Sequence, residues 1–377
     1  MASLIVRSPV TRIVIKTLLL FVALNLLMLV IDPLPALSEI SVYGWLVPAR
    51  SRLPYGEQAT RAYNLSLNSL DAMFNSHRVK QAKAPDEFRV LLLGDSSVWG
   101  LLLHPDQTLD AYLNSANLRR GDRHLRFYNL GYPVQSLTKD VLILDAALHY
   151  QPDLIVWLVT LEAFAPDQQL VPVLVRTNAP RLRAISGLPL PADAASRLFS
   201  PSWQDRTLIG RRRDLADLLW LQVYGLAWGV TGLDQVYLPT FKPTLSDFTP
   251  AAFPNGLENW HTLQPSQPLT PDQLAFNVLQ AGVLRAGSVP VLVVNEPIFV
   301  SSGLNSDLRY NYFYPRWVYD QYRVLLRDAA ASNHWTLRDL WDSIPATEFT
   351  DSPVHLTPHG SQLLASKIAS TIDLDSP

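Results

Sequence analysis

Short apolar stretches alternate with segments of helical spacing over most of the chain, and this alternation constrains the fold more than any other feature. The apolar stretches lie at residues 88–93, 125–130, 153–159, 290–295 and 335–340. The helical segments lie at residues 136–150, 270–286, 316–331 and 358–371. Near-continuous apolar strands that alternate with helices are typical of a parallel sheet covered on both faces. The pattern predicts an α/β fold with three layers, α/β/α, around a central parallel sheet.

An apolar run at residues 13–31 precedes this region and has the length of a membrane span. As a helix rising about 1.5 Å per residue it would cover about 28 Å, close to the ~30 Å hydrocarbon core of a bilayer. Arg7, Arg12 and Lys16 lie before the run or near its start, and no further positive charge occurs until Arg50. By the positive-inside rule, this bias places the N-terminus in the cytoplasm and the rest of the chain outside.

The run has two interpretations. The first is a single-pass anchor that fixes the chain in the lipid bilayer of the cell membrane and leaves its domain extracytoplasmic. The alternative is a signal peptide cleaved after the small residues of Ala36-Leu37-Ser38, which would make the protein secreted. Both interpretations place the bulk of the chain outside the cytoplasm.

The domain organisation predicted from these patterns has three parts. Residues 1–32 form the anchor or signal, residues 33–85 a stalk that packs on the domain, and residues 86–377 the α/β domain. Residues 163–265 interrupt the alternation and are expected to be a helical insertion. Within them, residues 218–233 carry no charge, and a helix of that length covers about 24 Å, which is short for a span. We favour a helix buried in the insertion, with an interfacial helix or a second span as alternatives.

Composition excludes several classes of function. Lys and Arg number 31 and Asp and Glu 33, giving a net charge of −2, which argues against a nucleic-acid partner. The chain has no cysteine, which excludes thiolate nucleophiles and metal sites built on Cys. It also lacks the phosphate-loop, dinucleotide and HExxH zinc motifs. We therefore expect no cofactor and no metal.

Residues with the chemistry of a serine nucleophile and its base follow the first predicted strand and precede the last helix. Ser96 stands in the sequence Gly94-Asp95-Ser96, directly after the strand. Functional groups gather at the carboxyl ends of parallel strands, and N–H groups at a helix start favour a developing negative charge. His355 would supply the base, and Asp351 the carboxylate that orients it. The structural alternative is that Ser96 only caps a helix and His355 is an ordinary loop residue.

Together these segments resemble the SGNH/GDSL hydrolase family. The resemblance implies a flavodoxin-like α/β/α fold and hydrolysis of ester bonds by a serine mechanism. It implies that Ser96 is the nucleophile and that His355 and Asp351 complete the triad. It also implies an oxyanion hole made by the backbone N–H groups of Ser96 and Gly131.

The resemblance covers roughly residues 88–160 and 288–372, and this chain departs from the family at two points. Leu161 stands where the family has the Asn of its oxyanion hole. Asp351 precedes His355 by four residues, where the family usually has three. Both departures bear on the rate of ester hydrolysis more than on the fold.

Three further polar residues at predicted strand ends are candidates for substrate binding: Thr160, Glu162 and Glu296. An aromatic segment at residues 310–317 has ring faces that suit a sugar or an acyl group, although it could equally pack on the body of the domain.

The sequence thus predicts a membrane-anchored serine esterase that acts on an acyl ester outside the cytoplasmic membrane. The first alternative is an O-acyltransferase that passes the acyl group to a cell-envelope polysaccharide. The second is a non-catalytic domain of the same fold that binds a glycan or a protein partner. The sequence does not indicate the acyl chain or the oligomeric state.

Overall fold

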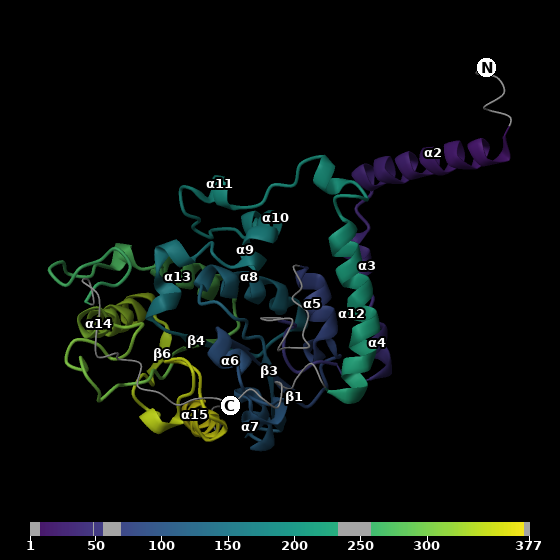
Figure 1. Ribbon diagram of the computed structural model, residues 1–377. Coiled ribbons are helices and arrows are strands. Elements are labelled where there is room, and N and C mark those ends of the chain that lie inside the picture. The colour runs from purple at the N-terminus through teal and green to yellow at the C-terminus, as the bar shows by residue number, and fades with distance from the viewer. Residues whose placement is uncertain (1–7, 48, 56–68, 233–257, 373–377) are drawn as a thin grey trace.

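The computed structural model describes residues 8–47, 49–55, 69–232 and 258–372 (Figure 1). Its centre is a six-stranded sheet with the strand order β2-β3-β1-β4-β5-β6. The strands β3, β1, β4, β5 and β6 run parallel, as predicted, and a two-residue edge strand that the sequence did not predict, β2, pairs antiparallel with β3. The strands are β1 (Glu87–Leu93), β2 (Arg119–Arg120), β3 (Arg123–Asn129), β4 (Leu154–Val159), β5 (Val291–Asn295) and β6 (Thr336–Asp339).

Helices cover both faces of the sheet, which confirms the three-layer arrangement (Figure 1). One face shares its hydrophobic core with α8, α13 and α14, and the opposite face with α7 and α15. These helices are α7 (Leu109–Ser115), α8 (Leu137–Ala147), α13 (Phe276–Arg285), α14 (Arg316–Asn333) and α15 (Pro358–Thr371). Short 3-10 turns lie between the main elements: η2 (Pro105–Gln107), η3 (Leu148–Tyr150), η8 (Pro271–Gln273) and η9 (Ala346–Glu348).

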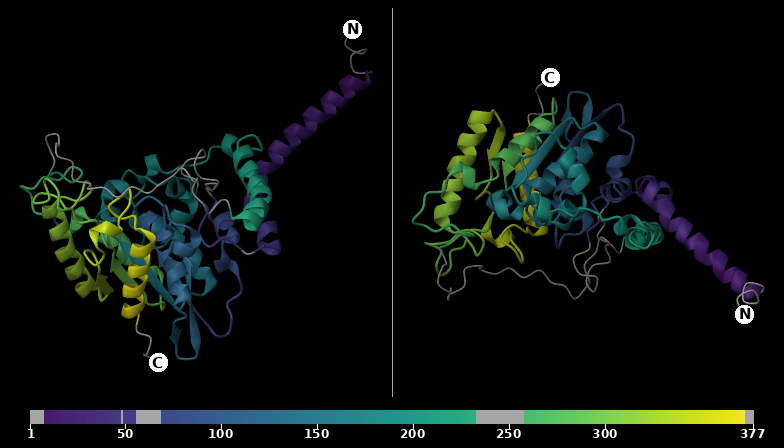
Figure 2. Two further views of the ribbon diagram at one scale, coloured as in Figure 1. Left: turned by 60° about the horizontal axis from the view of Figure 1, so that its bottom comes forward. Right: turned by 90° about the horizontal axis from the view of Figure 1, so that it is seen from above.

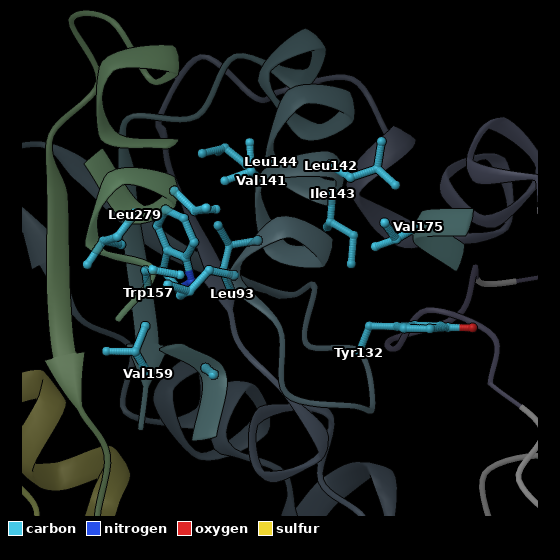
Figure 3. Close-up of a cluster of buried hydrophobic side chains, with 14 of the residues drawn as sticks. Leu93, Tyr132, Val141, Leu142, Ile143, Leu144, Trp157, Val159, Val175 and Leu279 are labelled. Atoms are coloured by element: carbon cyan, nitrogen blue, oxygen red, sulfur yellow. The ribbon is translucent and has the colours of Figure 1, made fainter. Parts of the chain in front are cut away.

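Trp157 of β4 lies at the centre of the core on the α8 side (Figure 3). Its side chain is fully buried between the strands and the helices α8 and α13. Gly282 of α13 faces the indole ring, where a Cβ atom would stand 2.5 Å from the ring carbons. The glycine therefore allows α13 to approach β4 closely enough to cover the tryptophan.

The helix predicted at residues 270–286 is broken in two. Thr270 and Gln273 form a reciprocal capping box around the 3-10 turn η8, and Leu274 then adopts an extended conformation. The α-helix begins only at Phe276. The sequence signal for a helix start at Thr270-Pro271 was real, but it belongs to a separate turn.

The segment at residues 33–85, of which 56–68 lie outside the described residues, packs into the core of the domain. Leu53, Phe74 and Val79 share the core of the α8 face. Arg52 is fully buried, and its guanidinium donates to the carbonyl oxygens of Trp99, Gly100 and Leu103 at 2.9–3.3 Å. The elements are α3 (Leu34–Ser38), α4 (Val42–Leu46), α5 (Leu70–Ser76) and η1 (Arg78–Lys80). In its described part, the predicted stalk is therefore a structural part of the domain rather than a spacer.

The described part of the insertion at residues 163–265 forms short helices and one long helix on the α8 side of the sheet. These elements are η4 (Leu161–Phe164), η5 (Pro166–Gln168), α9 (Val173–Thr177), α10 (Ala179–Ala184), α11 (Ala194–Arg197), η6 (Gln204–Arg206) and α12 (Arg212–Thr231). Residues 233–257, which include the end of the uncharged run, lie outside the described residues. Within α12 only Leu218, Leu221 and Gly225 are buried. The expectation of a helix buried in the insertion is therefore wrong for α12.

The N-terminal helix α2 (Pro9–Val30) projects away from the body of the protein (Figure 2). None of its residues is buried, and most of its side chains are apolar. Among the described residues it is the one helix long and apolar enough to cross a membrane. A membrane anchor and a signal sequence both have these properties.

Candidate active site at the carboxyl edge of the sheet

The candidate site lies where β1 and β4 end side by side. The chain leaves β1 toward α7 on one face of the sheet, and leaves β4 toward α13 on the other face. Adjacent strands whose connections diverge in this way leave a crevice at their carboxyl ends, where α/β proteins bind ligands. Ser96 follows β1 at this point and begins the short helix α6 (Ser96–Trp99).

The backbone before Ser96 is fixed by two residues. Gly94 has φ +152°, and a Cβ atom there would stand 2.6 Å from Val98 Cγ2. Asp95 caps α6, because its Oδ1 accepts the N–H of Ser97 at 2.7 Å. This tight turn is the physical reason for the Gly-Asp-Ser sequence. It sets Ser96 at the first helical position, where a backbone N–H has no intrahelical acceptor.

The structure brings the three predicted triad residues together. His355 Nε2 lies 2.8 Å from Ser96 Oγ, and His355 Nδ1 lies 2.8 Å from Asp351 Oδ1. A carboxylate at Nδ1 stabilises the tautomer with a proton on Nδ1, which leaves the Nε2 lone pair to accept the serine proton. The imidazole is buried, whereas the side chain of Asp351 is 42% exposed. The arrangement has the geometry of a nucleophile, a base and an orienting acid.

The four-residue spacing between Asp351 and His355 is accommodated by a turn. Thr350 N–H donates to the His355 carbonyl at 2.9 Å, and His355 N–H donates to the Ser352 carbonyl at 3.3 Å. The Pro353 carbonyl accepts the N–H of Phe299, which ties the turn to the chain after β5. The extra residue therefore bulges into a turn and does not separate the carboxylate from the imidazole.

The environment of Asp351 favours its ionised form. Partial burial by itself would raise the pKa of this carboxyl group, but the hydrogen bond from His355 and the charge of an imidazolium outweigh that effect. The net result is a pKa of Asp351 below its ordinary value. The carboxylate is thus charged at neutral pH and can stabilise a protonated His355.

Behind the nucleophile lies a buried group of ionisable side chains, of which only Glu296 was predicted at the site. Glu296 Oε2 accepts a hydrogen bond from the Ser97 hydroxyl. Lys139 Nζ donates to the carbonyl oxygens of Gly94 and Tyr132 at 2.9 and 2.5 Å and pairs with Asp140 at 2.9 Å. The lysine therefore stabilises the turn between β1 and α6 through the carbonyl oxygen of Gly94. The only sequence signal was a Lys-Asp pair in an otherwise apolar stretch of the predicted helix.

The pKa of Glu296 is shifted by its position in this group. Burial raises the pKa of Glu296 well above its ordinary value, and the nearby charge of Asp95 adds to the effect. Glu296 was predicted to bind substrate, but its side chain is buried and directed to Ser97. Glu296 therefore supports the turn that carries Ser96.

We expect Glu296→Gln to remove a pH dependence of stability. A carboxyl group with a raised pKa in the folded state contributes stability at low pH and loses it as the pH rises through that pKa. As the pH rises above about 5, the free energy of unfolding of the wild type should therefore fall by more than that of the Gln variant, which cannot ionise. Urea unfolding across this range measures the difference. Parallel curves for the two proteins would contradict a raised pKa of Glu296.

The N–H of Gly131 is already engaged in this structure. It donates to Asn129 Oδ1 at 3.1 Å, while Asn129 Nδ2 donates to the carbonyl of Val98 at 2.7 Å. A Cβ atom at position 131 would stand 2.5 Å from the backbone nitrogen of Trp99. The glycine is thus required for close packing of β3 on α6, and the expectation that its N–H serves the oxyanion hole needs correction.

The loop after Gly131 contains two unusual features beside the same turn. Tyr132 N–H donates to the Gly94 carbonyl at 3.0 Å, so the loop runs along the Gly-Asp-Ser segment. Val134 has φ +73°, a left-handed conformation that is strained for a β-branched residue. The side-chain nitrogen of Gln135 is buried and has no hydrogen-bond partner among the described residues. Backbone strain and an unsatisfied buried donor are both typical of functional loops.

The remaining candidates at the end of β4 face elsewhere. Leu161 is fully buried in the core of the α8 face, so no donor stands there. The Thr160 hydroxyl is buried 3.2 Å from the hydroxyl of Tyr314. Glu162 accepts the Trp260 indole N–H at 3.1 Å and pairs with His261 at 2.9 Å. Neither Thr160 nor Glu162 has an unengaged polar group directed at Ser96.

The aromatic loop predicted at residues 310–317 lies against the turn that carries Asp351. Asn311 is fully buried and organises the loop, because its Oδ1 accepts the N–H groups of Phe313 and Tyr314 at 2.9 and 3.1 Å. The Tyr312 hydroxyl hydrogen-bonds Ser352, next to Asp351. Tyr312 as a whole residue is 39% exposed, so it is accessible to solvent beside the turn that carries Asp351.

Several solved structures are similar to this chain. The native aryl esterase of M. smegmatis is 13% identical, covers 75% of this chain and 97% of its own, and has a TM-score of 0.33. Est24, a carbohydrate acetylesterase from Sinorhizobium meliloti, is 14% identical with the same coverages and TM-score. An extracellular lipase from Streptomyces rimosus is 14% identical, covers 74% and 99%, and also has a TM-score of 0.33.

No protein-family model matches the sequence, and no curated protein matches it. At the identities and TM-scores of the solved structures, the likeness assigns no activity. The proposed function therefore rests on the geometry of the site.

Proposed function

We propose that this chain is a serine esterase of the SGNH/GDSL type. The observation that carries the proposal is the pair of 2.8 Å hydrogen bonds that joins Ser96 Oγ to His355 and His355 to Asp351. Ser96 and His355 are 259 residues apart in the sequence. A purely structural role for Ser96 or for His355 would not require that they form this hydrogen-bonded series with Asp351. The catalytic residues proposed here are Ser96, His355 and Asp351.

In the proposed reaction, Ser96 Oγ attacks the carbonyl carbon of the ester while His355 Nε2 takes the hydroxyl proton. The tetrahedral intermediate then collapses, the bond to the leaving oxygen breaks, and His355 returns the proton to that oxygen. A water molecule attacks the acyl-enzyme with His355 again as the base, which releases the acid and restores the Ser96 hydroxyl. Asp351 keeps the imidazole oriented and stabilises its positive charge in both halves.

For the oxyanion hole we propose the N–H of Ser96 together with the side-chain amide of Gln135. Ser96 N–H is at the first position of α6, and Gln135 has a buried donor without a partner among the described residues. Gln135 also belongs to the loop whose backbone is bonded to Gly94. In this proposal the side-chain amide of Gln135 replaces the Gly131 N–H as the second donor, because that N–H is hydrogen-bonded to Asn129 Oδ1.

Gln135→Ala is expected to lower kcat by about 10²–10³, because losing one donor to the oxyanion typically costs that much. Gln135→Glu should lose as much, since a carboxylate has no donor. KM should change little, because the interaction forms only in the transition state. Steady-state kinetics on a p-nitrophenyl ester measures both constants, and unchanged kcat in both variants would exclude Gln135 from the hole.

A labelling experiment tests the proposed function itself. A fluorophosphonate probe should react with Ser96 in the wild type, and the labelled residue is identified by peptide mass spectrometry. Labelling at Ser96 is required by a serine esterase and by a serine acyltransferase. A folded protein that remains unlabelled would favour the third interpretation, a non-catalytic glycan-binding or partner-binding domain.

One observation favours the second candidate, an O-acyltransferase that acts on a cell-envelope polysaccharide. Tyr312 is exposed beside the turn that carries Asp351, where its ring would stack on a sugar that accepts the acyl group. A glycan acceptor added to the acyl-enzyme separates the two activities. Acylated glycan indicates transfer, whereas release of the free acid at an unchanged rate indicates hydrolysis.

We further propose that α2 anchors the chain and that the catalytic domain is extracytoplasmic. The support is the length of α2, the fact that none of its residues is buried, and the basic residues Arg7, Arg12 and Lys16 near its N-terminal end. A reporter active only outside the cytoplasm should give signal when fused after residue 40, and a reporter active only inside should not. The reverse pattern would overturn this topology, and detergent-free release of the mature chain would indicate a cleaved signal.

A further inference from the structure

The outward face of α12 is apolar, which is the reverse of an ordinary surface helix. Its exposed side chains include Leu219, which is 64% exposed, and Val230, which is 76% exposed. Trp220, Val223 and Tyr224 lie between them and are also exposed. The spacing of three and four residues places all of these on one face. No charged residue occurs in α12 after Asp217, so no charged side chain interrupts this apolar face.

The opposite face of α12 is fixed to the body, so the apolar face cannot turn inward. A Cβ atom at Gly225 would stand 2.3 Å from the ring of Tyr43, so the helix packs closely on α4. The Gln222 side chain accepts the N–H of Val42 and donates to the carbonyl of Ile40, both at 2.8 Å. These contacts determine which side of α12 faces outward.

Aromatic residues extend the apolar face in a way that suits the headgroup region of a bilayer. The exposed rings of Trp220 and Tyr224 stack with centroids 4.9 Å apart, and Tyr224 stacks in turn on Trp228, which packs against the core, with centroids 5.5 Å apart. Trp45 and Leu46 of α4, which packs beside α12, are strongly exposed as well. Trp and Tyr are enriched where a protein meets the membrane interface, since their rings are apolar and their edges polar.

The position of α12 relative to α2 bears on what could cover the apolar face of α12. In Figure 1, α2 points away from the body, while α12 starts near the end of α2 and runs crosswise to it along the side of the body. Asn25 Oδ1 accepts the N–H of Ile209 at 3.2 Å, and Arg211 pairs with Asp32 at 3.2 Å. The end of α2 and the start of α12 are therefore joined. If α2 crosses a bilayer along its axis, α12 lies in the plane of the membrane surface.

We propose that the apolar face of α12, together with Trp45 and Leu46, lies on the lipid bilayer and orients the catalytic domain toward the membrane surface. This inference rests on the proposed membrane anchor. Arg212 and Arg213 at the start of the helix are exposed and add attraction to anionic lipid headgroups. A helix of this kind is held by its buried apolar area and its charge, with no specific lipid required.

Site-directed spin labelling tests the proposal on the full chain, which has no native cysteine. Three single-Cys variants carry the label: Leu20→Cys in α2, Val223→Cys on the apolar face, and Leu284→Cys on α13 as a water-exposed control that is 68% exposed. Each protein is reconstituted into vesicles of phosphatidylcholine and phosphatidylglycerol. The ratio of oxygen to nickel-chelate accessibility then reports the depth of each label.

We expect the ratio at Val223 to lie between the high ratio at Leu20 and the low ratio at Leu284. A Val223 ratio equal to that of Leu284, with Leu20 still in lipid, would overturn the docking and leave the anchor intact. A low ratio at Leu20 would overturn the anchor and the docking with it, while fluorophosphonate labelling of Ser96 would be unaffected. Spin–spin broadening at Val223 that disappears on dilution with unlabelled protein would indicate a second copy of the chain on this face, which also overturns the proposal.

Discussion

The Ser96→Ala variant is expected to lose about 10⁶-fold in kcat for ester hydrolysis, the size of the loss when a triad nucleophile is removed. The methyl group cannot form the acyl-enzyme, so fluorophosphonate labelling should disappear as well. The fold should remain, because the side chain is not part of the core and its Oγ contacts His355 rather than a structural group. Kinetics, labelling and the melting temperature together measure these expectations.

Ser97 provides the matched control for this experiment. It is adjacent in sequence and similarly half-buried, but its Oγ bonds Glu296 instead of a histidine. Ser97→Ala should therefore remain labelled at Ser96 and lose far less activity, as expected for a residue that supports the turn. The opposite result, with activity lost only in Ser97→Ala, would show that the nucleophile has been misidentified.

The strands and the triad could be predicted from the sequence for a common physical reason. The central strands β1 and β4 are buried on both faces, which leaves apolar runs with clear ends, and β1 (Glu87–Leu93) lies within one residue of its prediction. In such a fold the carboxyl ends of the strands meet at one edge. Ser96 directly follows β1 and His355 lies in the loop before α15, and both reach this edge although they are far apart in sequence.

The details of the oxyanion hole could not be predicted in the same way. The position of Gly131 after β3 is visible in the sequence, but the engagement of its N–H depends on the rotamer of Asn129. Leu161 aligns with a family donor, yet its side chain enters the core because the chain turns into a 3-10 helix after Thr160. Where a side chain points after a strand ends depends on tertiary packing, and strand alternation no longer applies there.

Buried charges were missed because their sequence context looks like that of surface residues. Arg52 lies in a Pro-containing polar segment, and Lys139 and Asp140 stand side by side in a helix. Charged residues are rarely buried unless their polar atoms are satisfied. Here the carbonyl oxygens of the turns around Ser96 supply the acceptors for Arg52 and Lys139. Only the three-dimensional structure reveals that these cations hold the candidate site in place.

Asp351→Asn is expected to lower kcat by between about 10² and about 10⁴, the range for loss of a positioned acid–base function and of the correct histidine tautomer. An amide can donate its N–H to His355 Nδ1, which moves the imidazole proton to Nε2 and removes the base from Ser96 Oγ. The exposure of Asp351 allows water to replace part of its function, so the loss should be smaller than for Ser96→Ala.

Two further variants make this assignment decisive. Glu162→Gln alters a carboxylate that bonds His261 and Trp260, so kcat should stay near the wild-type value. Asp351→Glu keeps the negative charge and should recover part of the activity lost in Asp351→Asn, because the longer side chain can still accept from Nδ1. The orienting carboxylate would be wrongly identified if Asp351→Asn were fully active and Glu162→Gln were not. With Asp351 only 2.8 Å from the imidazole and its pKa held below the ordinary value, the structure favours Asp351 for this role.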